Sequence, residues 1–180
     1  MQDVAAEAGM SPGNLYRYFP SKDAIVAGLA ERDRAAMAQG FAQLADAEDV
    51  STTLRRLARK HFLEEPRQKA VLCLEIWSEA TRNPAFASLH GDFDADVLGR
   101  LESLVRHAQD SGQASASIDP RSVALLMVTL ANGLFVRRAL TPNFDAEREI
   151  AQMMAVIEAA LAGAFELPPH PGGIGPRRSS

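Results

Sequence analysis

The sequence contains a single cysteine, few aromatic residues and no long apolar run. As the only cysteine, Cys73 cannot form a disulfide bond within the chain, which fits a reducing compartment. Gln2, Asp3 and Glu7 do not suit the basic and apolar regions of a secretory signal. The longest nearly apolar run, 123–136, falls short of the roughly 20 residues that span a membrane. We therefore expect a cytoplasmic protein without a membrane partner.

Patterns that support catalysis or metal binding are also rare. The sequence has neither a glycine-rich phosphate loop nor a recognisable nucleophile–base pair. Metal sites in helical bundles use Glu-x-x-His pairs, whereas His61 and Glu64 occur once and in the reverse order. Glu75 and Glu79 share a helical face without a histidine close in sequence. We expect no enzyme activity, no metal and no cofactor; an enzyme built on a helical bundle is the weakest alternative.

The charge balance shows little of the basic character expected of a nucleic-acid-binding protein. The 19 Lys and Arg residues are outnumbered by 23 Asp and Glu residues, which gives a net charge of −4 at pH 7. The first 34 residues carry four basic and five acidic side chains, a net charge of −1. Positive charge suited to DNA is therefore confined to the neighbourhood of Arg17 and Lys22.

The first twenty residues predict two short helices separated by a tight turn. The first helix is expected over residues 2–8, and Gly9 follows where a helix end favours a left-handed backbone. Ser11 is a suitable N-cap for a second helix over 12–18, which Pro12 can begin. This pattern predicts a helix-turn-helix, whose second helix enters the DNA major groove. An ordinary helical hairpin with a glycine turn is the alternative.

One side of the predicted second helix carries residues suited to DNA. Pro12, Gly13 and Asn14 keep its N-terminus slim, so that it can approach base edges. The phenol, guanidinium and ammonium groups that follow are not accompanied by a carboxylate. We expect DNA contacts from the following residues: Ser11, Pro12, Gly13, Asn14, Tyr16, Arg17, Tyr18 and Lys22.

The residues that end this helix and open the next one form a specific pattern. They are Leu15, Tyr16, Tyr18 and Phe19, followed by Ser21, Lys22 and Asp23. This pattern resembles the DNA-binding domain of TetR family transcriptional regulators, and the resemblance covers about residues 1–30. Combined with the helix pattern below, it predicts three parts: a DNA-binding domain with a connecting helix over 1–45, an effector-binding and dimerisation domain over 46–165, and a disordered tail over 166–180.

The beginning of the chain departs from the family pattern. Family members have a complete helix before this motif, and the sequence starts without it. Without such a cover, one side of Val4, Ala8, Leu15 and Phe19 would face water, at about 1.5–3 kcal/mol for each large side chain. We therefore expect the natural protein to start upstream of Met1, with an amphipathic helix that includes several basic residues.

The rest of the chain predicts helices and no strands. A long helix is expected from its N-cap Ser21 to about Ala45, followed by an acidic connector and a helix that Ser51 caps and Pro66 ends. Further helices are expected over 67–82, 84–111, 120–140 and 145–163. The segment 166–180 is rich in Pro and Gly. The predicted fold class is all-α, a helix-turn-helix unit followed by a larger helical domain.

The last two predicted helices indicate a homodimer. The helix over 120–140 is apolar nearly all round, so it must be covered on all sides. In a chain of this size, a second subunit is the expected cover. The final helix carries one apolar stripe, made of Ile150, Met153, Met154, Ile157 and Leu161. The resemblance likewise implies a four-helix bundle between two subunits, formed through about 120–163.

The middle helices of TetR-like regulators enclose a ligand pocket. Several residues of this region suit a mostly apolar pocket with a few polar anchors: His61, Phe62, Cys73, Trp77, Phe93 and Met127, together with Phe86. Trp77 is the strongest candidate because its indole N–H requires a partner. Ordinary core packing is the alternative for each residue. We expect a small, mostly apolar effector.

These features lead to one main hypothesis and an alternative from another class. The main hypothesis is a dimeric, ligand-responsive repressor on a palindromic operator, with two recognition helices about 34–36 Å apart in successive major grooves. Effector binding would tilt the helix that follows Ser21 and disturb that spacing. The alternative is a truncated dimerising or ligand-binding module with little affinity for DNA.

Overall fold

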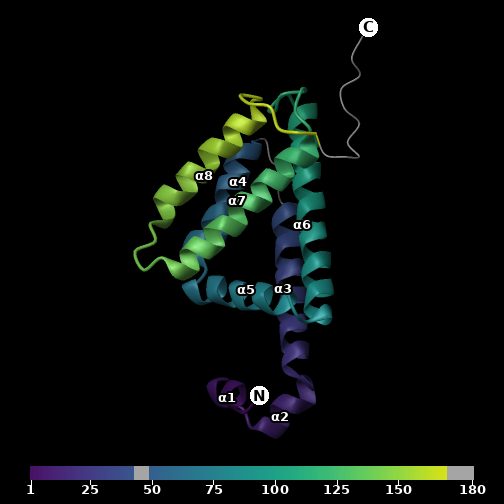
Figure 1. The fold of residues 1–180 in the computed structure, drawn as a ribbon, viewed down its shortest axis with the longest axis vertical. Helices are drawn as coiled ribbons and strands as arrows, with labels where there is room; N and C mark the ends of the chain where they lie inside the picture. The colour runs from purple at the N-terminus through teal and green to yellow at the C-terminus, as the bar shows by residue number, and fades with distance from the viewer. Residues whose placement is uncertain (43–48, 170–180) are drawn as a thin grey trace.

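The computed structural model describes residues 1–42 and 49–169, and every regular element in these ranges is a helix (Figure 1). At one end lie α1 (Gln2–Glu7) and α2 (Pro12–Tyr18), and α3 (Lys22–Ala42) leads from them to a larger helical body. The body contains α4 (Val50–Arg59), the π-helical turn η1 (Lys60–Glu64), α5 (Arg67–Ala80), α6 (Pro84–Asp110), α7 (Pro120–Leu140) and α8 (Ala146–Leu161). The predicted all-α class is confirmed.

The turn between α1 and α2 is built from the residues that the sequence indicates. Gly9 has a φ of +64°, and the N–H of Met10 donates to the carbonyl of Ala5 at 2.8 Å, which closes the end of α1. The Oγ of Ser11 accepts a hydrogen bond from the N–H of Asn14 at 3.3 Å. As a result α2 occupies its predicted range, while α1 is one residue shorter than predicted.

The long helix α3 connects the N-terminal helices to the body. Its N-cap is Ser21, whose Oγ accepts from the N–H of Ala24 at 3.1 Å. Gly28 allows a close approach of the end of α2, because a Cβ at this position would lie 3.2 Å from Cε1 of Phe19. Farther along, α3 packs on α6. The predicted helix end near Ala45, and with it the domain boundary, lies outside the described residues.

The start and end of α4 differ from the prediction. The N-cap is Asp49, whose carboxylate accepts from the N–H groups of Ser51 at 3.0 Å and Thr52 at 3.1 Å. Ser51 is therefore not the cap, because an aspartate two residues earlier can accept from two N–H groups at once. The helix ends before Pro66 as predicted, but its last turn is π-helical, which the sequence pattern did not indicate.

The core of the body lies between α4, α6, α7 and α8. Its least accessible large side chains are Val105, Val123 and Met154, one each from α6, α7 and α8. The apolar stripe of α8 faces this core, since all five of its members are buried: Ile150, Met153, Met154, Ile157 and Leu161. The prediction that this stripe meets a second subunit is wrong, because a helix with one apolar face has used it within its own chain.

The apolar helix α7 packs against α5, α6 and α8. In the described part of the chain, α7 is the one helix that is long and apolar enough to cross a membrane by length and composition, because it extends beyond the run 123–136. Its last turn carries Arg137 and Arg138, and the Arg138 side chain is buried in the body. Packing against three neighbouring helices accounts for much of its apolar character.

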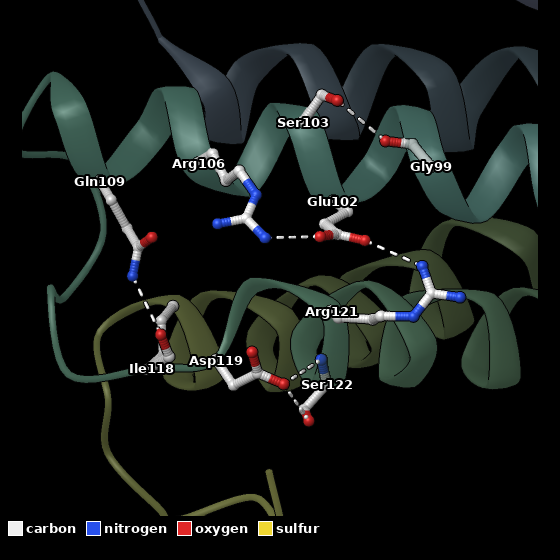
Figure 2. Close-up of polar contacts among 9 residues, drawn as sticks. All are labelled: Gly99, Glu102, Ser103, Arg106, Gln109, Ile118, Asp119, Arg121 and Ser122. Carbon is white, nitrogen blue, oxygen red and sulfur yellow. Dashed lines mark hydrogen bonds and ion pairs between the residues drawn. The ribbon is translucent and has the colours of Figure 1, made fainter. Parts of the chain in front are cut away.

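Polar contacts hold the corner between α6 and α7 (Figure 2). Glu102 on α6 accepts from Arg106 at 2.6 Å and from Arg121 on α7 at 2.9 Å. The hydrogen bonds from Arg106 and then Arg121 hold the pKa of Glu102 below its usual value. Gln109 donates from Nε2 to the carbonyl of Ile118 at 3.0 Å. This corner lies at the end of the body opposite α1 and α2 (Figure 1).

The chain after α8 returns to the same corner. Leu167 packs against the core, and the Oγ of Ser122 donates to the carbonyl of Pro168 at 2.7 Å. The first residues of the segment predicted as a disordered tail therefore contact the body. The remainder of that prediction, 170–180, lies outside the described residues.

Candidate DNA-binding surface and effector region

The helix α2 lies beside α1 at the end of the molecule away from the body (Figure 1). All residues predicted to contact DNA are exposed: Ser11, Pro12, Gly13, Asn14, Tyr16, Arg17, Tyr18 and Lys22. We call these eight residues the DNA-binding surface. Leu15, in the same helix, is buried and anchors α2 to the rest of the N-terminal end. The helix therefore separates one anchoring position from a face that is open to a partner.

Two tyrosines of this surface are unusually accessible for large aromatic side chains. Tyr16 is 50% exposed and Tyr18 is 59% exposed. Arg17 donates from Nη2 to the Tyr18 Oη at 3.3 Å, and its guanidinium carbon lies 5.3 Å from the Tyr18 ring centroid. Stacking restricts the guanidinium before any partner arrives, so less side-chain entropy is lost on binding a phosphate. The arrangement suits contacts to a polyanion.

Gly13 leaves space at the start of α2. A Cβ added at this position would meet no atom of the chain within 4 Å. Neither the backbone conformation nor a neighbouring side chain therefore requires glycine here. The missing side chain instead leaves room for an approaching surface, as expected for a residue close to base edges.

Glu79, at the end of the body nearest α3, has its main charged partner close in sequence. The pKa of Glu79, near the end of α5, is lowered chiefly by its hydrogen bond from Arg82, whose Nε lies 2.9 Å away. The charge of Lys22 contributes to the same shift. The contribution of Lys22 is the smallest of the causes, so charge couples α5 to the start of α3 only weakly.

The residues predicted to bind an effector divide into two groups. Phe62, Phe86 and Met127 are buried, as expected for core positions. The others are partly exposed: His61, Cys73, Trp77 and Phe93. Side chains of the second group are the ones that a small molecule could reach without displacing the core.

Trp77 belongs to a row of four rings, which we call the aromatic cluster: Phe62, Phe135, Trp77 and His90. The ring centroid of Trp77 lies 6.1 Å from that of Phe135, edge-on at 89°, and 6.2 Å from that of His90. Phe135 lies 4.8 Å from Phe62. Neither His90 nor Phe135 is among the residues that the sequence predicted to bind an effector. His90 lies four residues after Phe86 and three residues before Phe93. This helical spacing was the signal that could have indicated His90.

Two arginines of α4 form ion pairs with glutamates of α8. Arg55 and Arg59 of α4 reach α8 and pair with Glu158 at 2.6 Å and Glu147 at 2.7 Å. Within 1–42 and 49–169, no group of three or more His, Cys, Asp or Glu side chains could hold a metal ion. The positive charge of α4 is thus partly compensated by carboxylates of α8 at the surface of the body.

Comparison with known families identifies the chain. Residues 52–162 match the family described as BetI-type transcriptional repressor, C-terminal, and residues 1–29 match the tetR family of bacterial regulatory proteins. The chain belongs to the TetR family of transcriptional regulators. The helix-turn-helix of α1 and α2 is therefore the DNA-binding unit of a transcription regulator, and the family consists of regulators rather than enzymes.

Individual relatives are distant but cover most of the chain. The HTH-type transcriptional regulator UidR of Escherichia coli K12 is 24% identical over 135 residues, which is 74% of this chain and 68% of UidR. Salmonella enterica GusR superposes with a TM-score of 0.73 at 22% identity and covers 89% of this chain and 83% of its own. A putative TetR-family regulator from Rhodococcus sp. has a TM-score of 0.73 at 20% identity, and the match covers 89% of this chain and 86% of the Rhodococcus chain. At these identities the two structures show the shared fold alone.

Proposed function

We propose that this TetR family member is an effector-responsive repressor that binds palindromic operator DNA as a homodimer in the cytoplasm. The observation that carries the proposal is the open face of α2, where two tyrosines and a stacked arginine stand exposed beside Lys22. In the proposed division, residues 1–45 bind DNA and residues 46–165 bind the effector and the second subunit. The repressor description of the family that matches 52–162 supports the direction of regulation.

The proposed dimer surface differs from the stripe that the sequence suggested. An exposed row runs along α7 at helical spacing: Leu125, Thr129, Gly133, Val136 and Leu140. Leu125 is 47% exposed and Leu140 is 68% exposed. Val156 on the neighbouring helix α8 is exposed as well. Four of these six residues are large apolar side chains that stand exposed. Exposed apolar patches favour a protein partner, so the six residues make up the proposed dimer surface.

The proposed effector is a small, mostly apolar molecule that contacts the aromatic cluster. Trp77 and His90 are partly exposed, and they offer an indole N–H and imidazole nitrogens beside apolar rings. Release from DNA requires that the effector bind the DNA-free form more tightly than the DNA-bound form. A route of packed helices runs from α5 through α6 to α3, and α3 begins at the DNA-binding surface.

DNA binding is tested with single substitutions in the DNA-binding surface, using promoter DNA next to the protein's own gene. Lys22→Ala should weaken binding to all sequences alike and reduce the log–log salt slope by about one. Arg17→Ala should weaken binding and, where Arg17 contacts a base, relax the sequence preference. Arg148→Ala, an exposed arginine on α8, is the matched control and should change neither quantity. Unchanged operator binding in both Lys22→Ala and Arg17→Ala would contradict the proposal.

The effector site is tested through Trp77, the only tryptophan. Compounds are first selected for release of the protein from operator DNA, and the emission of Trp77 is then measured with each. We expect releasing compounds to change this emission. A compound that releases DNA but leaves the Trp77 emission unchanged would contradict the placement of the effector.

A further inference from the structure

The junction between α4 and α5 has an unusual backbone. After Arg59 the helix continues as η1, which is closed by a hydrogen bond of 3.1 Å from the N–H of Glu65 to the carbonyl of Lys60, five residues earlier. The next donor in this pattern would be the N–H of residue 66, and it would bond to the carbonyl of His61. Residue 66 is Pro66, which has no N–H, so the local backbone cannot supply this bond.

Arg138, in the last turn of α7, supplies the donor. Its Nη1 donates to the carbonyl of His61 at 2.6 Å, and its Nη2 donates to the carbonyl of Glu65. Arg138 is 7% exposed, and this burial lowers its pKa against the opposing effect of the Glu65 charge. A buried cation is tolerated only where its hydrogen bonds are well made. The planar fork of one guanidinium thus serves two carbonyls of the same turn.

A second arginine makes the contact reciprocal. Arg67, the first residue of α5, donates from Nη2 to the carbonyl of Ala139 in the last turn of α7. The last carbonyls of a helix have no partner within the helix. Each arginine therefore satisfies a carbonyl of the opposite segment, and the junction and the end of α7 are bonded in both directions.

The same junction determines where the aromatic cluster stands. Phe62 belongs to η1, and its buried ring lies 4.8 Å from that of Phe135. Phe135 precedes Arg138 by three residues, which places both on one side of α7. Trp77 meets Phe135 edge-on at 6.1 Å. A change in the shape of η1 would move Phe62 and, through Phe135, change the surroundings of Trp77.

We propose that Arg138 is a positioning residue that holds η1 in its π-helical form, in place of the donor that Pro66 lacks. Without Arg138 the turn can take up an ordinary α-helical form, which rotates Phe62 relative to Phe135. The claim concerns one junction within a subunit, so it stands apart from DNA binding. Where an effector binds beside Trp77, as proposed above, Arg138 also connects that site to α7, the helix of the proposed dimer surface.

The test is a double-mutant cycle between Arg138 and Pro66 in the full chain. Arg138→Lys and Arg138→Met are made with and without Pro66→Ala, and each protein is measured by urea unfolding, Trp77 emission and near-UV circular dichroism. With Pro66 present, Arg138→Lys keeps the charge but loses the fork. It should change the Trp77 signals and raise the unfolding constant about tenfold or more. With Pro66→Ala, the new N–H can bond the carbonyl of His61, so both effects should shrink clearly.

The neighbouring arginine provides the matched control. Arg137 pairs on the surface with Glu149 at 2.6 Å, so Arg137→Lys should leave the Trp77 signals unchanged and show no coupling to Pro66→Ala. If Arg138→Met does not fold, Arg138→Lys carries the cycle alone. Equal effects of the Arg138 substitution in both backgrounds, or unchanged Trp77 signals in folded Arg138→Lys, would overturn the proposal. A wild-type chain that fails to bind operator DNA would refute the proposed function and leave this cycle intact.

Discussion

The N-terminal helices and the helical body are held in place by different means. Of the residues in α1 and α2, Ala5 and Leu15 are buried, whereas α7 alone buries nine of its residues. The N-terminal end relies on local backbone features such as the Gly9 turn and the Ser11 cap. The body relies on side chains that meet across several helices. The stability of the body should therefore tolerate changes in the DNA-binding surface. Changes in the core of the body should not be tolerated in the same way.

Core truncation should produce the largest effect and tests this difference directly. Met154 is fully buried between helices of the body, so Met154→Ala should lower its unfolding free energy by about 2–5 kcal/mol. Leu15→Ala is the counterpart at the N-terminal end and should leave the main unfolding transition of the body nearly unchanged. Urea unfolding followed by far-UV circular dichroism measures both. An equal loss for the two variants would show that the two regions are not independent.

A charge on the proposed dimer surface should separate the subunits without unfolding them. Leu125 is exposed on α7, so Leu125→Glu leaves the core intact but buries an unpaired charge in the dimer, which is strongly unfavourable. Sedimentation should show a folded monomer at micromolar concentration. Leu63→Glu, an exposed leucine on η1 outside this surface, is the control and should remain dimeric. A wild-type monomer under the same conditions would refute the dimer.

Filling the space at Gly13 should separate stability from DNA affinity. An added methyl group meets nothing in the chain, so Gly13→Ala should leave stability unchanged or raise it by less than about 1 kcal/mol. Operator binding should weaken, because the methyl group occupies space that a base edge would need. Fluorescence anisotropy with operator DNA measures the affinity. Undiminished binding would remove Gly13 from the DNA-binding surface.

The smallest expected effect is a dependence of stability on acid at the corner between α6 and α7. Hydrogen bonds from Arg106 and Arg121 lower the folded-state pKa of Glu102 from its ordinary value of 4.5. The unfolded chain therefore binds a proton more readily, and the contribution of Glu102 is complete above pH about 4.5 and is lost as the pH falls through the folded-state pKa. Glu102→Gln should reduce the loss of stability on acidification. If the unfolding free energy of Glu102→Gln depends on pH in the same way as that of the wild type, other carboxylates cause the loss of stability in acid.

Local features of this structure could be predicted from the sequence, whereas contacts between helices could not. The Gly9 turn and the caps at Ser11 and Ser21 depend on residues a few positions apart, and each lies where it was predicted. The Ser51 cap was wrong because Asp49 competes for the same N–H groups.

Contacts between distant segments explain what the sequence analysis missed. The direction of the Ile157 stripe depends on which helices surround α8, and periodicity identifies a face without naming its partner. The π-helical turn depends on Arg138, which lies 72 residues beyond Pro66. The aromatic cluster likewise joins Phe135 to rings of three other helical segments. The predicted contacts of the DNA-binding surface stay predictions, supported by the exposure of all eight residues.

The most direct test of the account compares wild-type protein and Leu125→Glu on one palindromic operator and on its isolated half-site. In the proposed dimer, α2 contacts DNA and the surface on α7 and α8 pairs two such helices. Wild-type protein should bind the palindrome far more tightly than the half-site. The folded Leu125→Glu monomer should bind both with the same weak affinity. A folded monomer that binds the palindrome as tightly as the wild type would contradict the account.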